Sequence, residues 1–319
     1  MTNFILRRLI HAGIVMIAMS FFIYLLIGLM PGDPIDLLAN ANPEITAADV
    51  ARLKALYGLD RPLLERYGNW LGATIQGDFG YSRLYAKPVL EVLATPILNT
   101  VILMASSLIL ACLLALPLAL VAARFRRTWL DHGVNCLAFA GMSVPSFWLC
   151  LLMILLFAVE LRWLPAGGVY SVGDGSFIDR LEHAVLPVAT LTVLTLGTIV
   201  RFGRGALIEG LGEAYVRTAR AKGLGRMAAI NRHVLPNALL PVVTVLALNF
   251  GTLLSGALVI ETIFAYGGMG KLIYDAVLGN DFNLALIGLL AATILTLLSS
   301  LFADILYAWL DPRITYGDG

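Results

Sequence analysis

Charged residues are scarce in this sequence. Asp, Glu, Lys and Arg together make up 13% of its 319 residues, whereas hydrophobic residues make up 59%, and the mean hydropathy is +0.86. This composition excludes an ordinary water-soluble globular domain, in which about a quarter of the residues are charged. The net charge of +1 also lacks the broad basic excess of a nucleic-acid-binding protein. The charges that are present gather between long apolar runs, which is typical of a polytopic helical membrane protein.

Cysteine and histidine are also rare, and they form no recognisable site. Cys112, Cys136 and Cys150 lie in apolar or nearly apolar stretches without the spacing of a redox or zinc motif, which argues against a disulfide framework. His132 and Cys136 are four residues apart and can share a helix face, but two ligands do not make a zinc site. The sequence has no His-Glu-x-x-His and no Gly-x-Ser-x-Gly motif. We therefore expect no catalytic, metal-binding or cofactor-binding residues in this chain, and no enzyme.

A glycine-rich stretch, Tyr266–Lys271, is the nearest approach to a phosphate-binding loop. That motif needs Gly where the chain has Ala265 and Ser or Thr where it has Leu272. The sequence therefore predicts no nucleotide site here.

Six apolar runs are long enough to cross a bilayer as helices. They are Leu9–Met30, Ile97–Ala123, Val134–Val159, Ala184–Val200, Val234–Ile260 and Leu284–Trp309. Prolines inside them are tolerated because neighbouring helices and local adjustments satisfy the freed backbone groups. The sequence predicts an all-α membrane protein with six transmembrane helices. Its expected parts are a terminus and first span (1–30), an extracytoplasmic helical insert (31–96) and a five-helix core (97–319).

The expected insert contains short amphipathic helices. Thr46 and Asp49 have the spacing of a capping box. Pro62 can open a second helix that carries apolar residues on one face, a pattern of helices that lie on a membrane or pack on a neighbour. Those apolar residues are Leu63, Leu64, Tyr67, Trp70, Leu71 and Ile75.

Positive charge is unevenly distributed between the two sides of the predicted spans. On this assignment thirteen Lys and Arg residues lie on one side, and three lie in the short loops of the other. The positive-inside rule places the richer side in the cytoplasm, together with both termini.

The basic stretch Tyr215–Pro236 is the main hydrophilic interruption late in the chain. The composition of Tyr215–Lys222 favours a helix, and Gly223 suits the position just after the end of that helix. Arg220 and Lys222 would lie in its last turn, where positive charge interacts favourably with the helix dipole. A second short helix is expected from Arg226 to Val234, with Pro236 in the first turn of the next span. The pattern predicts a short crosswise helix between a glycine hinge and a proline elbow. A solvated basic loop is the alternative on charge alone.

The same stretch resembles the EAA loop of permease subunits in ATP-binding-cassette importers. The family motif has EAA, three residues, Gly, nine residues and then Ile-x-Leu-Pro; here Gly223 is followed after nine residues by His233-Val-Leu235-Pro236. Arg217-Thr218-Ala219 stands in place of EAA and His233 in place of Ile. Tyr215–Leu224 resembles the dipeptide, oligopeptide and nickel branch of the family. Segments near the amino terminus, around Pro145 and Leu164, and at the carboxyl terminus extend the resemblance over nearly the whole chain.

This resemblance implies the type I importer permease fold, in the bacterial inner membrane. The chain would form half of a translocation path for di- or oligopeptides, or alternatively for nickel or another chelated metal. Its implied partners are a homologous second permease, two cytoplasmic ATP-binding subunits that hold ATP and Mg, and an extracytoplasmic solute-binding protein. Coupling to the ATPases would use a cytoplasmic loop at 203–233. The residues implied in it are Tyr215, Arg217, Thr218, Ala219, Arg220, Ala221, Lys222, Gly223, Leu235 and Pro236.

Polar residues within the predicted spans are candidates for the translocation path. We single out Thr195, Thr198, Asn249 and Ser255, for which helix–helix packing is the alternative role. A self-contained secondary transporter or channel is the alternative function from another class. The near absence of charge within the spans counts against an ion-coupled carrier, which needs charge-handling residues at mid-membrane.

Overall fold

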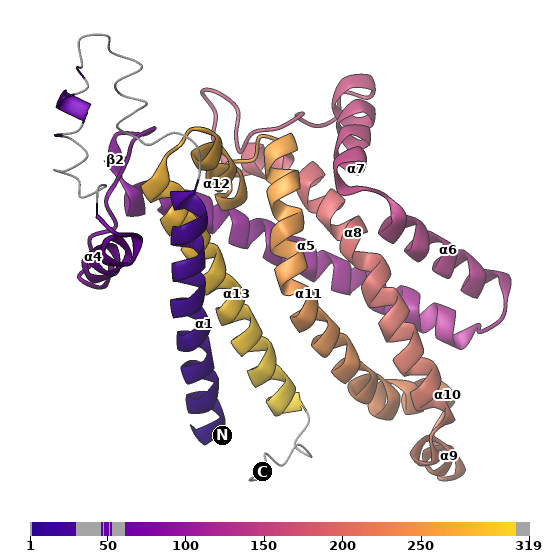
Figure 1. Cartoon of the computed structure of the whole chain (residues 1–319). Helices are drawn as coiled ribbons and strands as arrows, with labels where there is room; N and C mark the ends of the chain where they lie inside the picture. Colours follow the sequence, from indigo (N-terminus) through magenta and orange to yellow (C-terminus); the bar gives the residue numbers. More distant parts are fainter. Residues whose placement is uncertain (1, 30–45, 47, 51, 53–60, 311–319) are drawn as a thin grey trace. The chain divides into compact units, whose positions relative to one another are not determined.

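The computed structural model describes residues 2–29, 46, 48–50, 52 and 61–310 (Figure 1). The described chain is mainly helical and falls into two compact units. The first unit is drawn from residues 1–98 and 271–295, and the second from residues 99–270 and 296–319. Three helices cross from one unit to the other: α5 (Val89–Arg124), α12 (Met269–Leu278) and α13 (Phe282–Leu310).

In the first unit, helix α4 (Leu63–Ile75) packs against α1 (Thr2–Gly28) through aromatic side chains. The ring centroid of Tyr67 lies 5.2 Å from that of Phe21 and 5.6 Å from that of Tyr24. The Ser20 hydroxyl lies 2.7 Å from the Tyr67 hydroxyl and joins the two helices. The amphipathic helix predicted after Pro62 is therefore confirmed, and its neighbour in this unit is α1.

A short hairpin, which we did not predict, is fastened to the start of α13. Strands β1 (Tyr81–Ser82) and β2 (Lys87–Pro88) pair antiparallel. The buried Asp281 carboxylate accepts hydrogen bonds from the Ser82 hydroxyl at 2.5 Å and the Leu84 amide at 3.0 Å. It also accepts from the Leu284 amide at 3.3 Å, so one side chain both holds the hairpin and caps the helix.

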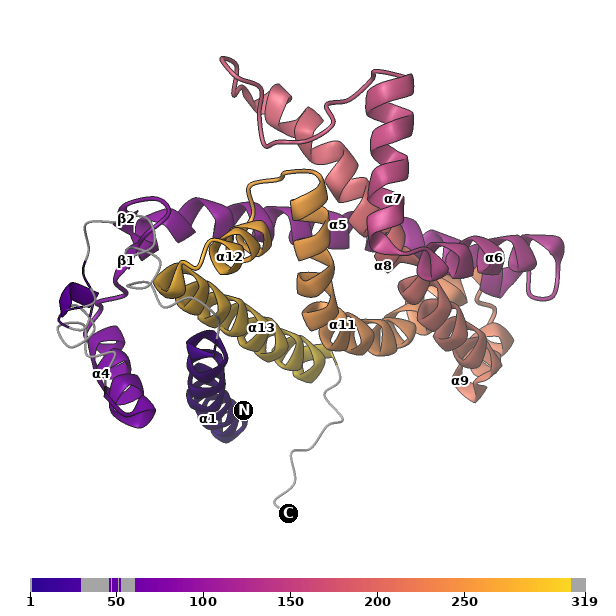
Figure 2. The ribbon, with the colours of Figure 1, turned by 45° about the horizontal axis from the view of Figure 1, so that its top comes forward.

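The second unit is a helical bundle centred on two long helices, α8 (Phe177–Gly212) and α11 (Leu235–Ile263) (Figures 1 and 2). Helix α6 (Trp129–Ser143) packs along α8, and α7 (Ser146–Met153) continues into a π-helical segment, η1 (Ile154–Glu160). Three short elements connect α8 to α11. They are α9 (Ala214–Ala221), α10 (Arg226–Ala229) and a second π-helical segment, η2 (Ile230–Val234).

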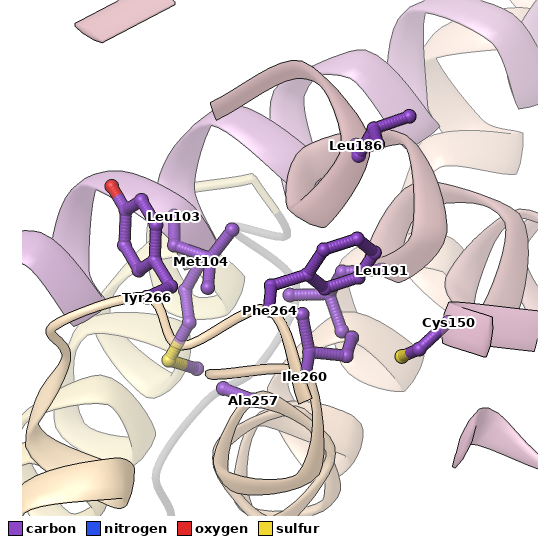
Figure 3. Close-up of a cluster of buried hydrophobic side chains, with 9 residues drawn as sticks. All are labelled: Leu103, Met104, Cys150, Leu186, Leu191, Ala257, Ile260, Phe264 and Tyr266. Atoms are coloured by element: carbon purple, nitrogen blue, oxygen red, sulfur yellow. The ribbon is translucent and has the colours of Figure 1, made fainter. Parts of the chain in front are cut away.

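One buried apolar cluster of this unit brings together side chains from α5, α7, α8 and α11 (Figure 3). Phe264 is its largest fully buried side chain and lies just after the end of α11. Its carbonyl accepts a 2.8 Å hydrogen bond from the Gly168 amide. A Cβ atom on Gly167 would lie 2.2 Å from the same oxygen, so a glycine is required where the two loops meet.

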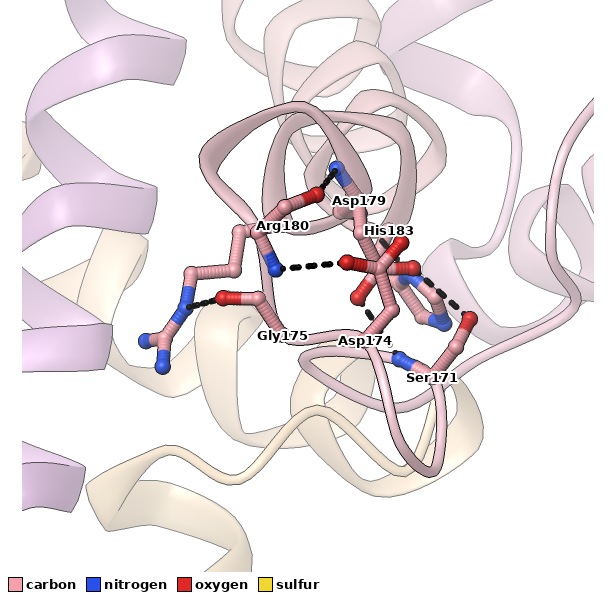
Figure 4. Close-up of polar contacts among 7 residues, drawn as sticks. Ser171, Asp174, Gly175, Asp179, Arg180 and His183 are labelled. Carbon is pink, nitrogen blue, oxygen red and sulfur yellow. Dashed lines mark hydrogen bonds and ion pairs between the residues drawn. The ribbon is translucent and has the colours of Figure 1, made fainter.

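Helix α8 begins in a compact polar turn (Figure 4). The Ser176 hydroxyl accepts a hydrogen bond from the Asp179 amide and caps the helix. Asp179 in turn accepts from the Ser171 amide and hydroxyl, both at 2.7 Å. His183, one turn further on, lies with Nδ1 2.9 Å from the Asp179 carbonyl. The Ser176 hydroxyl therefore satisfies one of the first backbone donors of α8, which have no partner within the helix.

Four described helical segments are long and apolar enough to cross a membrane: Leu6–Gly28, Val89–Arg124, Phe177–Gly212 and Phe282–Phe302. They coincide with the first, second, fourth and sixth predicted spans. The fifth predicted run lies in α11, which is continuous over 29 residues. At 1.5 Å per residue a helix of that length is about 43 Å long, enough for a bilayer core.

The third predicted span, Val134–Val159, is not one straight helix. It consists of α6 and the α7–η1 segment, bent by 102° between Ser143 and Ser146. Pro145 is the physical cause: proline disfavours helical geometry in the residue before it, and Val144 is extended (φ −77°, ψ 128°). With this bend counted as one span, the described part of the chain offers up to five.

Two expected boundaries fall inside helices. Helix α5 begins at Val89, so the boundary expected at 96/97 lies within its third turn. Helix α8 runs to Gly212, so the loop expected at 203–233 begins inside it. Between residues 30 and 60 the structure describes only 46, 48–50 and 52, so most of the first part of the expected insert lies outside the described residues. Thr46 and Asp49 do bond as a capping box, since the Asp49 amide donates to the Thr46 hydroxyl and the Thr46 amide to the Asp49 carboxylate.

Candidate functional site

The basic stretch after α8 forms a short helix with a complete cap. Glu213 is extended (ψ 151°) and turns the chain out of α8, and α9 then covers Ala214–Ala221. Gly223 has φ +89°, the left-handed geometry that glycine adopts without strain. The Gly223 amide donates to the Arg220 carbonyl at 3.0 Å and the Leu224 amide to the Ala219 carbonyl at 3.2 Å. This is a Schellman motif, so the predicted helix and its glycine terminator are confirmed.

One apolar residue anchors α9 to the bundle. Val216 is 4% exposed and belongs to a buried cluster with side chains from α5, α8, η2 and α11. The close approach of α8 to η2 near the same place requires Gly210, since a Cβ atom there would lie 2.9 Å from Val234 Cγ1. Sequence reasoning missed Val216, whose only signal was an apolar side chain inside a basic helix. The cluster attaches α9 to the ends of three long helices, α5, α8 and α11.

The polar side chains of α9 lie on the surface. Arg217, Thr218, Arg220, Ala221 and Lys222 are all exposed. Arg217 and Thr218 also bond to carbonyls of the preceding turn, those of Gly212 and Ala214. The helix thus presents a fixed basic face outward, with Tyr215 partly exposed beside it.

The expected proline elbow is not present. Pro236 is exposed in the first turn of α11, but Val234 and Leu235 keep helical dihedrals, so the chain passes from α10 through η2 into α11 without a break. The wider π turn explains this, because the Leu235 amide donates to the Ile230 carbonyl, five residues back, and so continues the helix. Pro236 has no backbone N–H to donate, but it lies in the first turn of α11, where the missing donor is tolerated. The sharp turn of this region is at Gly223 instead.

The four residues proposed for a translocation path are distributed over two helices of the second unit. Thr195 is buried in α8, and its hydroxyl donates to the Leu191 carbonyl of the same helix at 2.8 Å. Thr198 is half-buried one turn further along. Asn249 and Ser255 belong to α11, but their side chains lie outside the described residues. Their role in a path stays a prediction.

The glycine-rich stretch after α11 packs around a carboxylate. Glu261 is fully buried and accepts a 2.6 Å hydrogen bond from the Thr100 hydroxyl, which accepts from the Met269 amide. A Cβ atom on Gly268 would lie 2.2 Å from the Glu261 carboxyl carbon. Burial, together with this carboxylate, raises the pKa of Tyr266. The glycines of this stretch thus make room for a buried acid.

An ion pair between a buried acid and a half-buried arginine links α6 to α8, and its only sequence signal is one acid near the start of an apolar run. Asp131 is 2% exposed, and its carboxylate accepts from Arg204 Nε at 2.6 Å and Nη2 at 2.8 Å. In the sequence, Arg204 is one of the thirteen basic residues on the side predicted to be cytoplasmic.

Comparison with known proteins assigns the family. Residues 115–316 match the family described as binding-protein-dependent transport system inner membrane component, and residues 1–95 match the amino-terminal family of such membrane components. The chain belongs to this family. It is thus a multi-pass inner membrane component of a transport system.

Related proteins match over the whole length of this inner membrane component. It is 34% identical over 318 residues to the oligopeptide transport system permease protein AppB of Bacillus subtilis, covering 99% of this chain and 100% of AppB. It is 36% identical over 316 residues to a putative peptide permease of Brucella suis, covering 98% and 99% of the two chains. It is 34% identical over 316 residues to the glutathione transport system permease protein GsiC of Escherichia coli K12, covering 99% and 100%.

A solved structure supports the fold. An inward-facing structure of the MetNI methionine ABC transporter superposes with a TM-score of 0.58 at 20% identity, covering 70% of this chain and 98% of the other. This inner membrane component therefore has the helical fold of an ABC importer's membrane subunit, as predicted from its sequence.

Proposed function

We propose that this chain is the permease subunit of a binding-protein-dependent ABC importer for peptides, and that α9 is its coupling helix. Family membership carries the transport role. The peptide assignment is supported by relatives named for oligopeptide, peptide and glutathione transport that align along their whole lengths. Nickel or another chelated metal is the alternative cargo.

The geometry of α9 supports a role in transmitting movement from a docked partner to the membrane spans. Its outer face carries Arg217, Arg220 and Lys222 on a helix capped at Gly223, while Val216 fixes its inner face to the bundle. A rigid, exposed helix fastened to α5, α8 and α11 can pass the movement of a docked partner to the spans. A loosely tethered basic loop could not do so.

The proposed partners follow from this arrangement. ATP and Mg would be bound and ATP hydrolysed by two cytoplasmic subunits that dock on α9, so this chain would itself be non-catalytic. ATP binding would favour one arrangement of the docked ATPases and thereby shift the permease from inward-facing to outward-facing, because the two states differ in these contacts. Both termini would lie in the cytoplasm, in line with the bias of positive charge.

A second, homologous permease would complete the path, and a solute-binding protein would deliver the cargo from the extracytoplasmic side. Thr195, Thr198, Asn249 and Ser255 remain our candidates for lining the path. The segment Pro31–Pro96 and the loop around Ala265–Lys271 are our candidates for the receptor-facing surface, although only Ala265 is exposed within that loop.

The experiment is reconstitution of the complete importer in liposomes with a mixture of isotope-labelled peptides of two to six residues. Uptake should require ATP, the ATPases, the second permease and the binding protein. Uptake by this chain alone would instead establish a secondary transporter or channel. ATP-driven uptake of nickel but of no peptide would replace the peptide assignment while leaving the role of a permease intact.

A further inference from the structure

The Asp131 carboxylate in the second unit accepts several hydrogen bonds. Both of its oxygens accept from the Arg204 guanidinium, at 2.6 and 2.8 Å. The Arg127 amide donates to it at 2.9 Å and the Asn135 side-chain amide at 2.8 Å. Four donors thus converge on one carboxylate that is 2% exposed.

These bonds join three segments of the second unit. Arg204 belongs to α8, Asp131 and Asn135 belong to α6, and Arg127 lies in the turn between α5 and α6 with a left-handed φ of +65°. Because a bidentate arginine–carboxylate contact fixes orientation as well as distance, rotation of α8 would displace the start of α6 and the turn before it.

The pair is also well placed relative to α9. Arg204 lies eight residues before Gly212, the last residue of α8, which is about 12 Å along the helix axis. The α6–α8 interface also includes a tight contact, in which Gly197 faces the Ala138 carbonyl so closely that a Cβ atom would lie 2.3 Å from it. That contact already holds the two helices together, so the ion pair is not needed merely to bring them into contact.

We propose that Asp131 and Arg204 are positioning residues for coupled transport: they pass the movement of α9 and α8 on to α6. The proposal rests on the proposed function, because it takes α9 as the place where ATP-driven movement enters the chain.

The test follows movement directly in the assembled importer and needs no knowledge of the cargo. Cys136 is an exposed native residue of α6 and can carry an environment-sensitive dye once Cys112 and Cys150 are replaced by Ala. A second reporter chain carries the dye at Ala228→Cys, an exposed position on α10 beside α9, with Cys136 also replaced. The signal measured is the change in fluorescence on adding ATP and vanadate.

Two substitutions each weaken the Asp131–Arg204 contact without removing the packing around it. Asp131→Asn removes the charge with little change of shape, and Arg204→Lys keeps the charge but loses the bidentate geometry. Arg201→Gln is the matched control, since Arg201 is an exposed arginine on the same helix that stacks on Phe202. In both test variants we expect the change at Cys136 to fall about tenfold while the change at position 228 persists. The control should respond at both positions like the unmodified chain.

A Cys136 signal that stays as in the unmodified chain in both variants would overturn the proposal. So would the absence of any nucleotide-dependent signal at Cys136 in the unmodified chain. Failure of both variants to assemble with the ATPases would also overturn it, because the pair would then serve folding alone. Absence of a signal at position 228 in the unmodified assembly would count against the proposed function itself and is therefore distinguishable.

Discussion

Gly223 ends α9 in a backbone conformation that a side chain makes costly. With φ at +89°, substitution by Ala should cost about 1 kcal/mol and fray the last turn of the helix. We expect Gly223→Ala to lower both the thermal stability of the purified complex and its ATP-driven uptake, as measured by a thermal-shift assay and in liposomes. Gly225→Ala is the control, because that glycine has no positive φ and open space around it. Equal effects of the two substitutions would contradict the role of the cap.

Val216 is the residue that turns an exposed helix into part of the bundle. Val216→Ala removes two buried methyl groups and should cost about 1–2 kcal/mol, which thermal unfolding of the purified chain would detect. Because α9 would then be less firmly attached, uptake should fall more than ATP hydrolysis does. Arg220→Ala, at an exposed position of the same helix, should leave the unfolding temperature unchanged. A loss of stability for Arg220→Ala alone would mean that the buried face has been assigned wrongly.

For single residues, the sequence predicts where a helix ends better than it predicts which side chains pack together. Gly223 could be predicted as the residue after the helix end, because a glycine after a helical stretch and cations in the last turn are local features of the sequence. Val216 and the Asp131–Arg204 pair could not, because each depends on a partner far away in the chain. Without knowledge of Arg204 as its partner, Asp131 near the start of an apolar run would be interpreted as a charge at the membrane interface.

Among the helices, α6 and α8 approach each other too closely for any side chain at one position. A Cβ atom on Gly197 would lie 2.3 Å from the Ala138 carbonyl and 2.6 Å from Met142 Cγ. Gly197→Ala should therefore destabilise the bundle by about 1–3 kcal/mol through overpacking. Gly205→Ala on the same helix meets nothing within 4 Å and should be neutral or stabilising, since Ala favours helix. Thermal unfolding in detergent compares the two, and an unaffected Gly197→Ala chain would contradict the close packing of α6 on α8.

In the first unit, Asp281 holds the β1–β2 hairpin to α13. Asp281→Ala leaves Ser82 and the Leu84 amide without this acceptor and removes a helix cap, so we expect a loss of about 2–4 kcal/mol. Protease cleavage within residues 81–88 should accelerate as well. Asp275→Ala breaks only a partly exposed pair with Lys271 and should cost under about 1 kcal/mol. If the two variants are cleaved at the same rate, Asp281 does not secure the hairpin.

The elements themselves were largely predictable, since long apolar runs have few ways to satisfy their backbone in a membrane. The exceptions have local causes. Pro145 bends the third run because it forces Val144 out of helical geometry, whereas Pro236 makes no elbow because it sits in a first turn next to a π segment. The hairpin was missed because two-residue strands carry no alternation, and its stability comes from Asp281, about 200 residues later.

For the molecule as a whole, family and fold follow from sequence because the loop spacing and the apolar runs are both local patterns. The division into two compact units does not, since α5, α12 and α13 each belong to both. The transported solute cannot be predicted from the loop spacing or the apolar runs either. The described polar groups of α8 mostly bond within the bundle, as Thr195 does, and therefore carry no signature of a particular solute.

The central claim is that α9 receives force from an ATPase that this chain lacks. The direct measurement is cross-linking from a single cysteine at Ala221, exposed on α9, in a chain whose three native cysteines are replaced by Ala. A short thiol cross-linker should join this position to the ATPase subunit of the assembled importer, and the buried position Val216→Cys should give far less product. Absence of any cross-link to an ATPase from every exposed position between Tyr215 and Gly223 would contradict the account.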